Sequence, residues 1–231
     1  MLGHIKKRKG FWEKEYRNGA HFSLSDKPSE DLEKFIRWYE REHSKPLLSR
    51  GISVLDLGCG NGRNLIYLAK EFGVNGTGYD NAYEAIAQAE KKSSELSIQY
   101  KVRSISDPIP LPEKSQTLVL DMMTSHLLKE SERNLLYREI ARVLKHDGWL
   151  FLKTFLLDED RNAERLLREH PAKEHGSYVH PKIGVAEHVF TEDEIRTVLT
   201  PYFTIHKLVK SHRHKGPRAK RRSMSIYAQK R

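Results

Sequence analysis

A glycine-rich segment, Val54-Leu-Asp-Leu-Gly-Cys-Gly-Asn-Gly62, most constrains what this chain of 231 residues can fold into. Its three glycines stand at every second position, after an apolar run and before a helical pattern of leucines. Glycine lets the backbone turn tightly and approach a ligand without a Cβ clash. The segment therefore predicts a ligand-binding turn between a buried strand and a helix.

Strand-like and helix-like segments alternate on both sides of this turn. The strand-like runs are Ile52–Leu57, Val74–Tyr79, Ile98–Ile105, Thr117–Met122 and Trp149–Phe155. Helical spacing marks residues 65–69, 83–96 and 136–144, and the last of these helices is expected to end near Asp147-Gly148. This alternation predicts an α/β fold, with a doubly wound, mostly parallel, seven-stranded sheet and helices on both faces. The segments Phe203–Val209 and Met224–Ala228 predict a C-terminal antiparallel β-hairpin.

The composition excludes several classes of protein. Hydrophobic residues make up 38% of the chain, which is not the composition of a disordered protein. No apolar run is long enough to cross a bilayer, and the basic N-terminus lacks the apolar segment of a secretory signal. The single cysteine, Cys59, excludes a disulfide framework or a cysteine zinc site, and we expect a reducing, cytoplasmic compartment.

The positive charge is concentrated at the two ends. The formal net charge is +10, but residues 10–204 hold 27 basic and 31 acidic side chains. Residues 205–231 carry ten lysines and arginines and no acid, six of them within 212–222. A localised basic segment indicates contact with an anionic partner, either RNA or an anionic metabolite, or else a solvated turn that blocks edge aggregation. His212 and His214 lie in this segment, but without nearby cysteines we expect no metal site.

An acidic residue at the end of the second strand accompanies the glycine turn. Asp80 stands where an acid accepts hydrogen bonds from a ribose. The spacing from Asp56 to Gly62, acid-x-Gly-x-Gly-x-Gly, resembles the first motif of the class I S-adenosylmethionine-dependent methyltransferases. Dinucleotide-binding dehydrogenases prefer Gly-x-Gly-x-x-Gly, whose third glycine would fall at Arg63. A Rossmann-like fold that binds another nucleotide is the alternative.

Further matches follow in order over about residues 50–155, the usual extent of such a core. Asp107 lies four residues before Leu111-Pro112, as in the family's adenine-binding segment. The run Leu118-Val-Leu-Asp121 is similar to the family's fourth strand. The step through Gly148 into Trp149-Leu-Phe-Leu is similar to the start of its fifth strand.

The resemblance implies S-adenosylmethionine as the cofactor and a set of binding residues. The glycine turn would shape the methionine end of the pocket, Asp80 would hold the ribose hydroxyls, and Asp107 would face the adenine amino group. Pro108 follows that acid and lacks the N–H that the family often gives to the adenine ring. The full implied set is Tyr16, Asp56, Gly58, Cys59, Gly60, Asn61, Gly62, Asp80, Asn81, Asp107 and Met122.

Three residues are candidates for the chemistry. Asp121 and Lys153 stand near the carboxyl ends of neighbouring strands, similar to two members of the Lys-Asp-Lys-Glu set of ribose 2′-O RNA methyltransferases, although the final Glu is missing. Alternatively, Asp121 supports the cofactor loop while Lys153 reaches for solvent. His126 follows the fourth strand, where a neutral imidazole would suit a base, or a hydrogen-bonded structural role.

Two kinds of methyl transfer to nucleic-acid bases do not fit the sequence. Cytosine C5 methylation needs a cysteine nucleophile, but Cys59 lies in the glycine turn. The fourth strand ends Asp121-Met-Met-Thr-Ser125 and lacks the Asn/Asp-Pro-Pro-Tyr tetrad typical of exocyclic amino methyltransferases. The N-terminal aromatic residues Trp12, Tyr16 and Phe22 would form either a lid over the cofactor or a helix packed on the sheet edge.

The sequence therefore predicts a single methyltransferase domain over residues 1–231. It divides into an aromatic and basic extension with a helix (1–50), a cofactor-binding core (51–155), and an acceptor-side insertion with a basic hairpin (156–231). The insertion is polar up to residue 190, with one helix over Arg161–Glu169. We expect in-line methyl transfer to an oxygen or nitrogen of an unidentified small molecule, for which an anionic one is a candidate. The alternatives are an RNA methyltransferase that docks RNA on 212–222, and a non-catalytic nucleotide- or RNA-binding protein.

Overall fold

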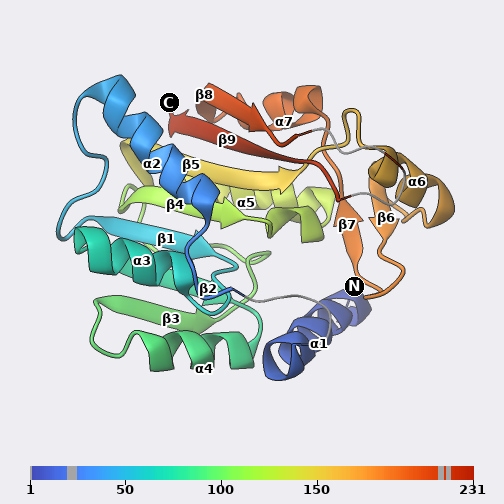
Figure 1. The fold of residues 1–231 in the computed structure, drawn as a ribbon, viewed down its shortest axis with the longest axis horizontal. Helices are drawn as coiled ribbons and strands as arrows, with labels where there is room; N and C mark the ends of the chain where they lie inside the picture. Colours follow the sequence, from blue (N-terminus) through green and yellow to red (C-terminus); the bar gives the residue numbers. More distant parts are fainter. Residues whose placement is uncertain (1, 20–24, 213–215, 217–219) are drawn as a thin grey trace.

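A seven-stranded sheet forms the centre of the protein, in the order β3-β2-β1-β4-β5-β9-β8 (Figure 1). The computed structural model describes residues 2–19, 25–212, 216 and 220–231. The strands of this sheet are β1 (Ser53–Leu57), β2 (Asn75–Asp80), β3 (Ile98–Val102), β4 (Gln116–Met122), β5 (Leu144–Phe155), β8 (Phe203–Lys210) and β9 (Ser223–Lys230). The first five are parallel, and β9 runs antiparallel to both β5 and β8. The expected fold class, with its closing hairpin, is therefore confirmed.

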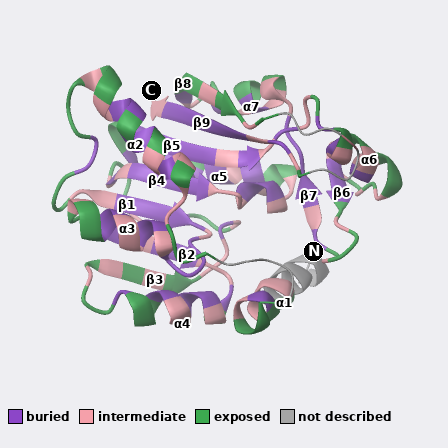
Figure 2. Ribbon diagram, viewed as in Figure 1, coloured by how far each residue is buried: buried purple, intermediate pink, exposed green. Residues whose placement is uncertain are grey.

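Helices cover both faces of the sheet, as expected. They are α1 (Leu2–Asn18), α2 (Glu30–His43), α3 (Arg63–Phe72), α4 (Tyr83–Lys92), α5 (Glu130–Val143), α6 (Arg161–Glu169) and α7 (Glu192–Leu199), with a short 3₁₀ turn, η1 (Ser125–Leu127). Buried side chains of α2 and α3 pack in one cluster, and those of α5 and α7 pack in another on the opposite face. Figure 2 shows the resulting pattern, in which the central strands are buried and the outer sides of the helices are exposed.

The helix α2 illustrates how the sequence builds these layers. It begins after Ser29, and acidic residues fill its first turn, where they favour the positive end of the helix dipole. Its buried face includes Leu32 and Phe35, and the ring of Phe35 stacks on Phe151 of β5 at 5.1 Å. Burying such rings removes a large apolar area from water and fixes α2 against the sheet.

Three expected boundaries are wrong. The helix expected over residues 83–96 ends at Lys92, where the backbone N–H of Ser93 caps it by bonding to the carbonyl of Glu90. The helix over residues 136–144 ends at Val143 rather than near Gly148, because Leu144 is fully buried and pairs with Gln116 as the first residue of β5. Leu144 follows Ile140 by four residues and so fits helical spacing, but it is the first residue of β5 instead. The third strand stops at Val102, because its partner β2 ends at Asp80, whose carbonyl accepts the last bond of the ladder from the backbone N–H of Arg103.

Residues 156–190 contain more structure than the sequence indicated. The helix α6 has the expected bounds, but a two-stranded antiparallel sheet, β6 (Ser177–Val179) and β7 (Ala186–His188), was not expected. Each strand has only three residues, too few for a periodic signal. In Figure 1 this small sheet lies beyond the carboxyl ends of β4 and β5. It adds a wall beside the edge where parallel sheets bind ligands.

The N-terminal segment forms α1, which packs against α4. Glu13 Oε2 accepts a hydrogen bond from the backbone N–H of Tyr83 at 2.8 Å, and Gln88 Nε2 donates to the carbonyl of Tyr16 at 2.7 Å. Of the expected aromatic lid, Phe22 lies outside the described residues. Within the described part of the chain, no helix is long and apolar enough to cross a membrane.

Candidate active site

The glycine turn joins β1 to α3 and places all three glycines in the left-handed backbone region. The φ angles are 73° at Gly58, 55° at Gly60 and 77° at Gly62, where side chains other than hydrogen are disfavoured. A Cβ at Gly58 would collide with the side chain of Thr124, and one at Gly60 would collide with the hydroxyl of Tyr16. The turn therefore presents bare backbone at the carboxyl edge of the sheet.

Asp80, at the end of β2, fixes the turn from the neighbouring strand. Its Oδ2 accepts a hydrogen bond from the backbone N–H of Gly60 at 3.0 Å, and its Oδ1 accepts from that of Ala82 at 2.9 Å. Burial raises the pKa of Asp80, while these backbone hydrogen bonds oppose the increase. The carboxyl group lines the cavity described next, so it can meet a ligand while it holds the turn.

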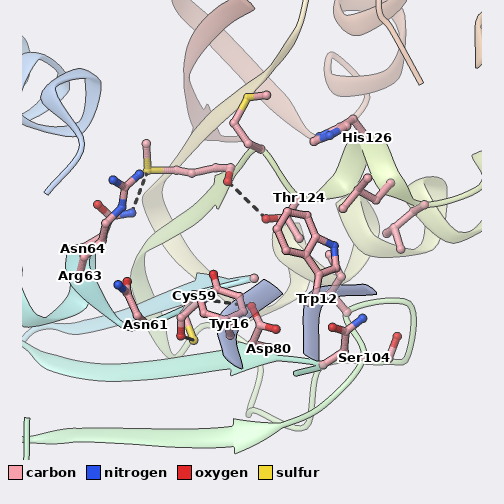
Figure 3. A pocket seen from close by; sticks show the side chains of 18 of the residues that line it. Trp12, Tyr16, Cys59, Asn61, Arg63, Asn64, Asp80, Ser104, Thr124 and His126 are labelled. Carbon is pink, nitrogen blue, oxygen red and sulfur yellow. Dashed lines mark hydrogen bonds between the residues drawn. The ribbon is translucent and has the colours of Figure 1, made fainter. Parts of the chain in front are cut away.

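A cavity of about 340 Å³ opens above the glycine turn and extends along the carboxyl ends of β1, β2, β4 and β5 (Figure 3). Most of the residues selected from the sequence line it. They are Tyr16, Gly58, Cys59, Gly60, Asn61, Asp80, Asn81, Met122 and His126. Five others that were selected do not line it, namely Asp56, Gly62, Asp107, Asp121 and Lys153.

The cavity also has lining residues that sequence reasoning missed. Phe155 stands at the carboxyl end of β5, so the rule that parallel sheets bind ligands at that edge would have found it. Ser104 and Ile105 follow β3 in the same way. Glu187 comes from the unexpected strand β7 and had no signal in the sequence.

The expected pair of Asp121 and Lys153 does not form. Asp121 pairs in register with Leu152 and Met122 with Lys153, so the two side chains lie on opposite faces of the sheet. Lys153 Nζ forms an ion pair with Asp31 Oδ2 of α2 at 2.5 Å. Asp121 is fully buried, and its Oδ1 accepts a hydrogen bond from the backbone N–H of Ser125 at 3.0 Å. We conclude that Asp121 supports the loop after β4, and that Lys153 ties α2 to the sheet.

Asp107 was placed at the adenine position by its spacing to Leu111, but it is exposed and outside the cavity. The buried anchor of this loop is Ile109, which is 3% exposed and donates its backbone N–H to Glu139 at 2.9 Å. Four residues before Ile109 stands Ile105, which does line the cavity. Ile105, rather than Asp107, is therefore the residue of this segment that reaches the cavity.

Asp56 lies beneath the glycine turn rather than in the cavity. It is 1% exposed, and within the described residues its Oδ2 has no hydrogen-bond partner. Burial, followed by the nearby Asp80 carboxyl, raises the pKa of Asp56 from 3.8 to about 7. Below a pH of about 7, Asp56 is therefore mostly protonated in the folded protein.

This raised pKa predicts a pH-dependent stability. Between 3.8 and about 7 the unfolded chain has lost the Asp56 proton and the folded chain keeps it. Folding then takes up a proton, so stability falls as the pH rises through this window. We expect Asp56→Asn to flatten the decline of the melting temperature over this range, measured by circular dichroism. Asp121 also has a pKa raised by burial, to about 6, so part of the decline should remain. Parallel wild-type and variant curves would contradict this assignment.

His126 lies at the far end of the cavity from the glycine turn, in η1 (Figure 3). It is 4% exposed, and its ring meets Phe155 edge-on at a centroid distance of 5.0 Å. Burial, helped by the positive charge of Arg221, lowers the pKa of His126 to about 3. The imidazole is therefore neutral at physiological pH, and it is a poor base for holding a full proton.

The helix α1 places Trp12 and Tyr16 over the cavity (Figure 3). Burial raises the pKa of Tyr16, and its hydroxyl packs on Gly60. The segment is a helix, as one of the two expectations had it, but it packs on α4, and two of its aromatic side chains line the cavity. Within the described residues, no group of three or more candidate ligands could hold a metal ion.

Comparison with known proteins agrees with this geometry. A family model described as a methyltransferase domain matches residues 54–148. A protein of Geobacillus sp. strain WCH70, named as a methyltransferase, is 28% identical over 120 residues, which are 52% of this chain and 46% of that protein. The chain spans less than half the length of the curated relatives it matches.

Solved structures show the same fold. An S-adenosylmethionine-dependent methyltransferase of Methanosarcina mazei is 25% identical with a TM-score of 0.68, over 88% of this chain and 98% of that one. The 1,6-didemethyltoxoflavin-N1-methyltransferase of Burkholderia thailandensis, solved with bound S-adenosylhomocysteine, is 16% identical with a TM-score of 0.69, over 99% and 89%. The strand order, the glycine turn and Asp80 define a class I, Rossmann-like methyltransferase fold. Residues 54–148 therefore form a methyltransferase domain, and the chain shares the fold of the S-adenosylmethionine-dependent methyltransferases.

Proposed function

We propose that this protein transfers the methyl group of S-adenosylmethionine to an oxygen or nitrogen atom of a small molecule. The observation that carries the proposal is the single cavity that runs from the glycine turn and Asp80 to His126 and Phe155. The end at the glycine turn and Asp80 offers the backbone and carboxylate groups that bind a nucleoside. The end at His126 and Phe155 is mostly apolar. The cavity therefore has a polar end and an apolar end, as ligand-binding cavities commonly do.

The residues at the first end fit the cofactor. Gly58 and Gly60 line the cavity with a backbone that Thr124 and Tyr16 pack against, and Asp80 offers carboxylate oxygens to ribose hydroxyls. Ser104 and Ile105, rather than Asp107, would then flank the adenine. When bound, S-adenosylmethionine supplies a methyl group on a positively charged sulfur, and its displacement leaves S-adenosylhomocysteine.

The protein contributes mainly alignment and exclusion of water. Holding a nucleophile in line with the methyl carbon removes much of the entropic barrier. Trp12 and Tyr16 cover the cavity from α1, which would keep water from the reacting atoms. Glu13 and Gln88 tie α1 to α4, so this cover is part of the folded domain.

The basic hairpin is the proposed contact for an anionic part of the acceptor. Since β8 runs parallel to β5, its carboxyl end opens at the same edge as the cavity. His212 and Lys220 stand at the described ends of this connection, while Arg213, Lys215 and Arg218 lie outside the described residues. A bound metabolite carboxylate or phosphate would be attracted here. The buried, free thiol of Cys59 supports the proposal of a reducing, cytoplasmic setting.

The proposal is tested with methyl-labelled S-adenosylmethionine, the purified protein and a whole-cell extract, with and without ribonuclease. We expect label in the low-mass fraction that resists ribonuclease and is absent with an Asp80→Ala variant. Label in large material that disappears after ribonuclease would replace the small molecule with RNA. No transfer, despite binding of S-adenosylhomocysteine, would contradict the proposed activity.

A further inference from the structure

Two buried polar side chains face the end of the cavity that the cofactor residues do not reach. Glu187 is 7% exposed and His126 is 4% exposed, and both line the cavity. Their neighbours in the lining are apolar, including Leu127, Leu128 and Phe155. Polar groups buried among apolar walls are costly unless a partner satisfies them. Their placement therefore points to a polar group on the ligand.

The carboxylate of Glu187 is held at one oxygen only. Its Oε2 accepts a hydrogen bond from the hydroxyl of Tyr178 and lies 3.9 Å from Arg221 Nη1. Arg221 also donates to the Tyr178 hydroxyl and to Asp160 Oδ2, the latter at 3.0 Å, and its guanidinium lies 4.4 Å from the centroid of Phe155. No hydrogen bond from a described residue reaches Glu187 Oε1. The network thus fixes the carboxylate and leaves one oxygen for a ligand.

His126 also has an open hydrogen-bonding position. Its Nδ1 is fully buried without a hydrogen-bond partner among the described residues, whereas its Nε2 is not fully buried and no described residue bonds to it, so Nε2 is the nitrogen that a ligand can reach. The edge-on contact with Phe155 fixes the ring, and the positive charge of nearby Arg221 disfavours its protonation. A neutral imidazole can accept or donate one hydrogen bond at this position, according to its tautomer.

We propose that the reacting end of the acceptor is a hydroxyl or N–H group on a flat apolar ring, bound to Glu187 Oε1 and His126 Nε2 with its ring against Phe155. This inference rests on the proposed function, and it names the substrate class of the same site. An ionised carboxylate repels an anion, so any anionic group of the acceptor lies toward the basic hairpin. The aromatic and leucine side chains favour a planar body.

The proposal also accounts for the proton that methyl transfer releases. The lone pair of the acceptor oxygen or nitrogen forms the new bond to the methyl carbon, and the electron pair of the broken carbon–sulfur bond stays on sulfur. The proton of the acceptor passes to Glu187 Oε1. His126 keeps the acceptor oriented, because a neutral ring with a lowered pKa cannot hold that proton at physiological pH.

Two planar probes test this assignment by binding to protein loaded with S-adenosylhomocysteine. The probes are 1-naphthol, which carries a hydroxyl, and 1-methoxynaphthalene, which cannot donate. We expect the wild type to bind 1-naphthol about tenfold more tightly, the size of a hydrogen bond to a charged group. In Glu187→Gln the preference should disappear. Tyr178 and Arg221 require an acceptor, so the amide oxygen takes the place of Oε2 and the NH₂ group faces the probe.

Glu159→Gln is the matched control. Glu159 also pairs with an arginine, Arg222 at 3.0 Å, but its side chain is 54% exposed and does not line the cavity. It should keep the wild-type preference. Equal binding of the two probes to the wild type, binding of neither, or an unchanged preference in Glu187→Gln would overturn the inference. Affinity for S-adenosylhomocysteine is measured for all three proteins, and only its absence in the wild type would count against the proposed function.

Discussion

Asp80→Ala should abolish most cofactor binding while the protein stays folded. The variant loses the carboxylate that we assign to the ribose, and it also loses the acceptor of the Gly60 and Ala82 backbone N–H groups. Hydrogen bonds to a charged group contribute about 1.5–3 kcal/mol each, so losing two lowers affinity by about 100-fold or more. Isothermal titration with S-adenosylhomocysteine measures this effect. Asp80→Asn keeps one side-chain acceptor and should lose less, about tenfold.

Asp107→Ala is the control for Asp80→Ala, because it also removes an acidic side chain near this edge of the sheet, but one outside the cavity. Asp107 is exposed and does not line the cavity, although the sequence match placed it at the adenine. Its removal should leave affinity within about twofold of the wild type, as for most surface changes. If Asp107→Ala weakened binding as much as Asp80→Ala, our assignment of the adenine end would be wrong.

Gly58→Ala should be among the most destabilising single substitutions in the chain. A residue with a Cβ at a φ of 73° costs about 1–2 kcal/mol in backbone strain, and the collision with Thr124 adds about 1–3 kcal/mol of overpacking. For a domain of this size, the sum lowers the melting temperature by roughly 4–20 °C. A thermal denaturation curve followed by circular dichroism gives the result directly.

Gly184→Ala measures the backbone strain of a positive φ without a side-chain collision. Gly184 has a similar φ of 64°, but a Cβ there would meet nothing within 4 Å. It should therefore show only the backbone part of the cost, about 1–2 kcal/mol. A second change, Thr124→Gly, should recover part of the loss in Gly58→Ala. If Gly58→Ala and Gly184→Ala melted at the same temperature, Thr124 would have no role in shaping the turn.

The sheet was predictable because its signals are local. Each buried strand is a short apolar run, each helix repeats its apolar residues at helical spacing, and the glycines mark the turn between them. Asp80 was found by the same reasoning, since the carboxyl ends of neighbouring parallel strands meet at one edge. The hairpin β8–β9 followed from two strand-like runs around a basic turn.

The side-chain environments were less predictable. Asp121 and Lys153 stand on adjacent strands, but a one-residue difference in register sends their side chains to opposite faces. Asp107 was selected by its spacing to a leucine, whereas the loop is anchored by Ile109. Glu187 reaches the cavity from a three-residue strand far along the chain, a placement that only tertiary packing determines.

The central claim is that the glycine turn and Asp80 bind S-adenosylmethionine, and the most direct test is a titration of the wild-type protein with S-adenosylhomocysteine and, separately, with NAD⁺. We predict one site per chain for S-adenosylhomocysteine, with a dissociation constant on the order of 1–100 μM, and no heat of binding for NAD⁺. Binding of NAD⁺ in place of S-adenosylhomocysteine, or binding of neither, would contradict the account.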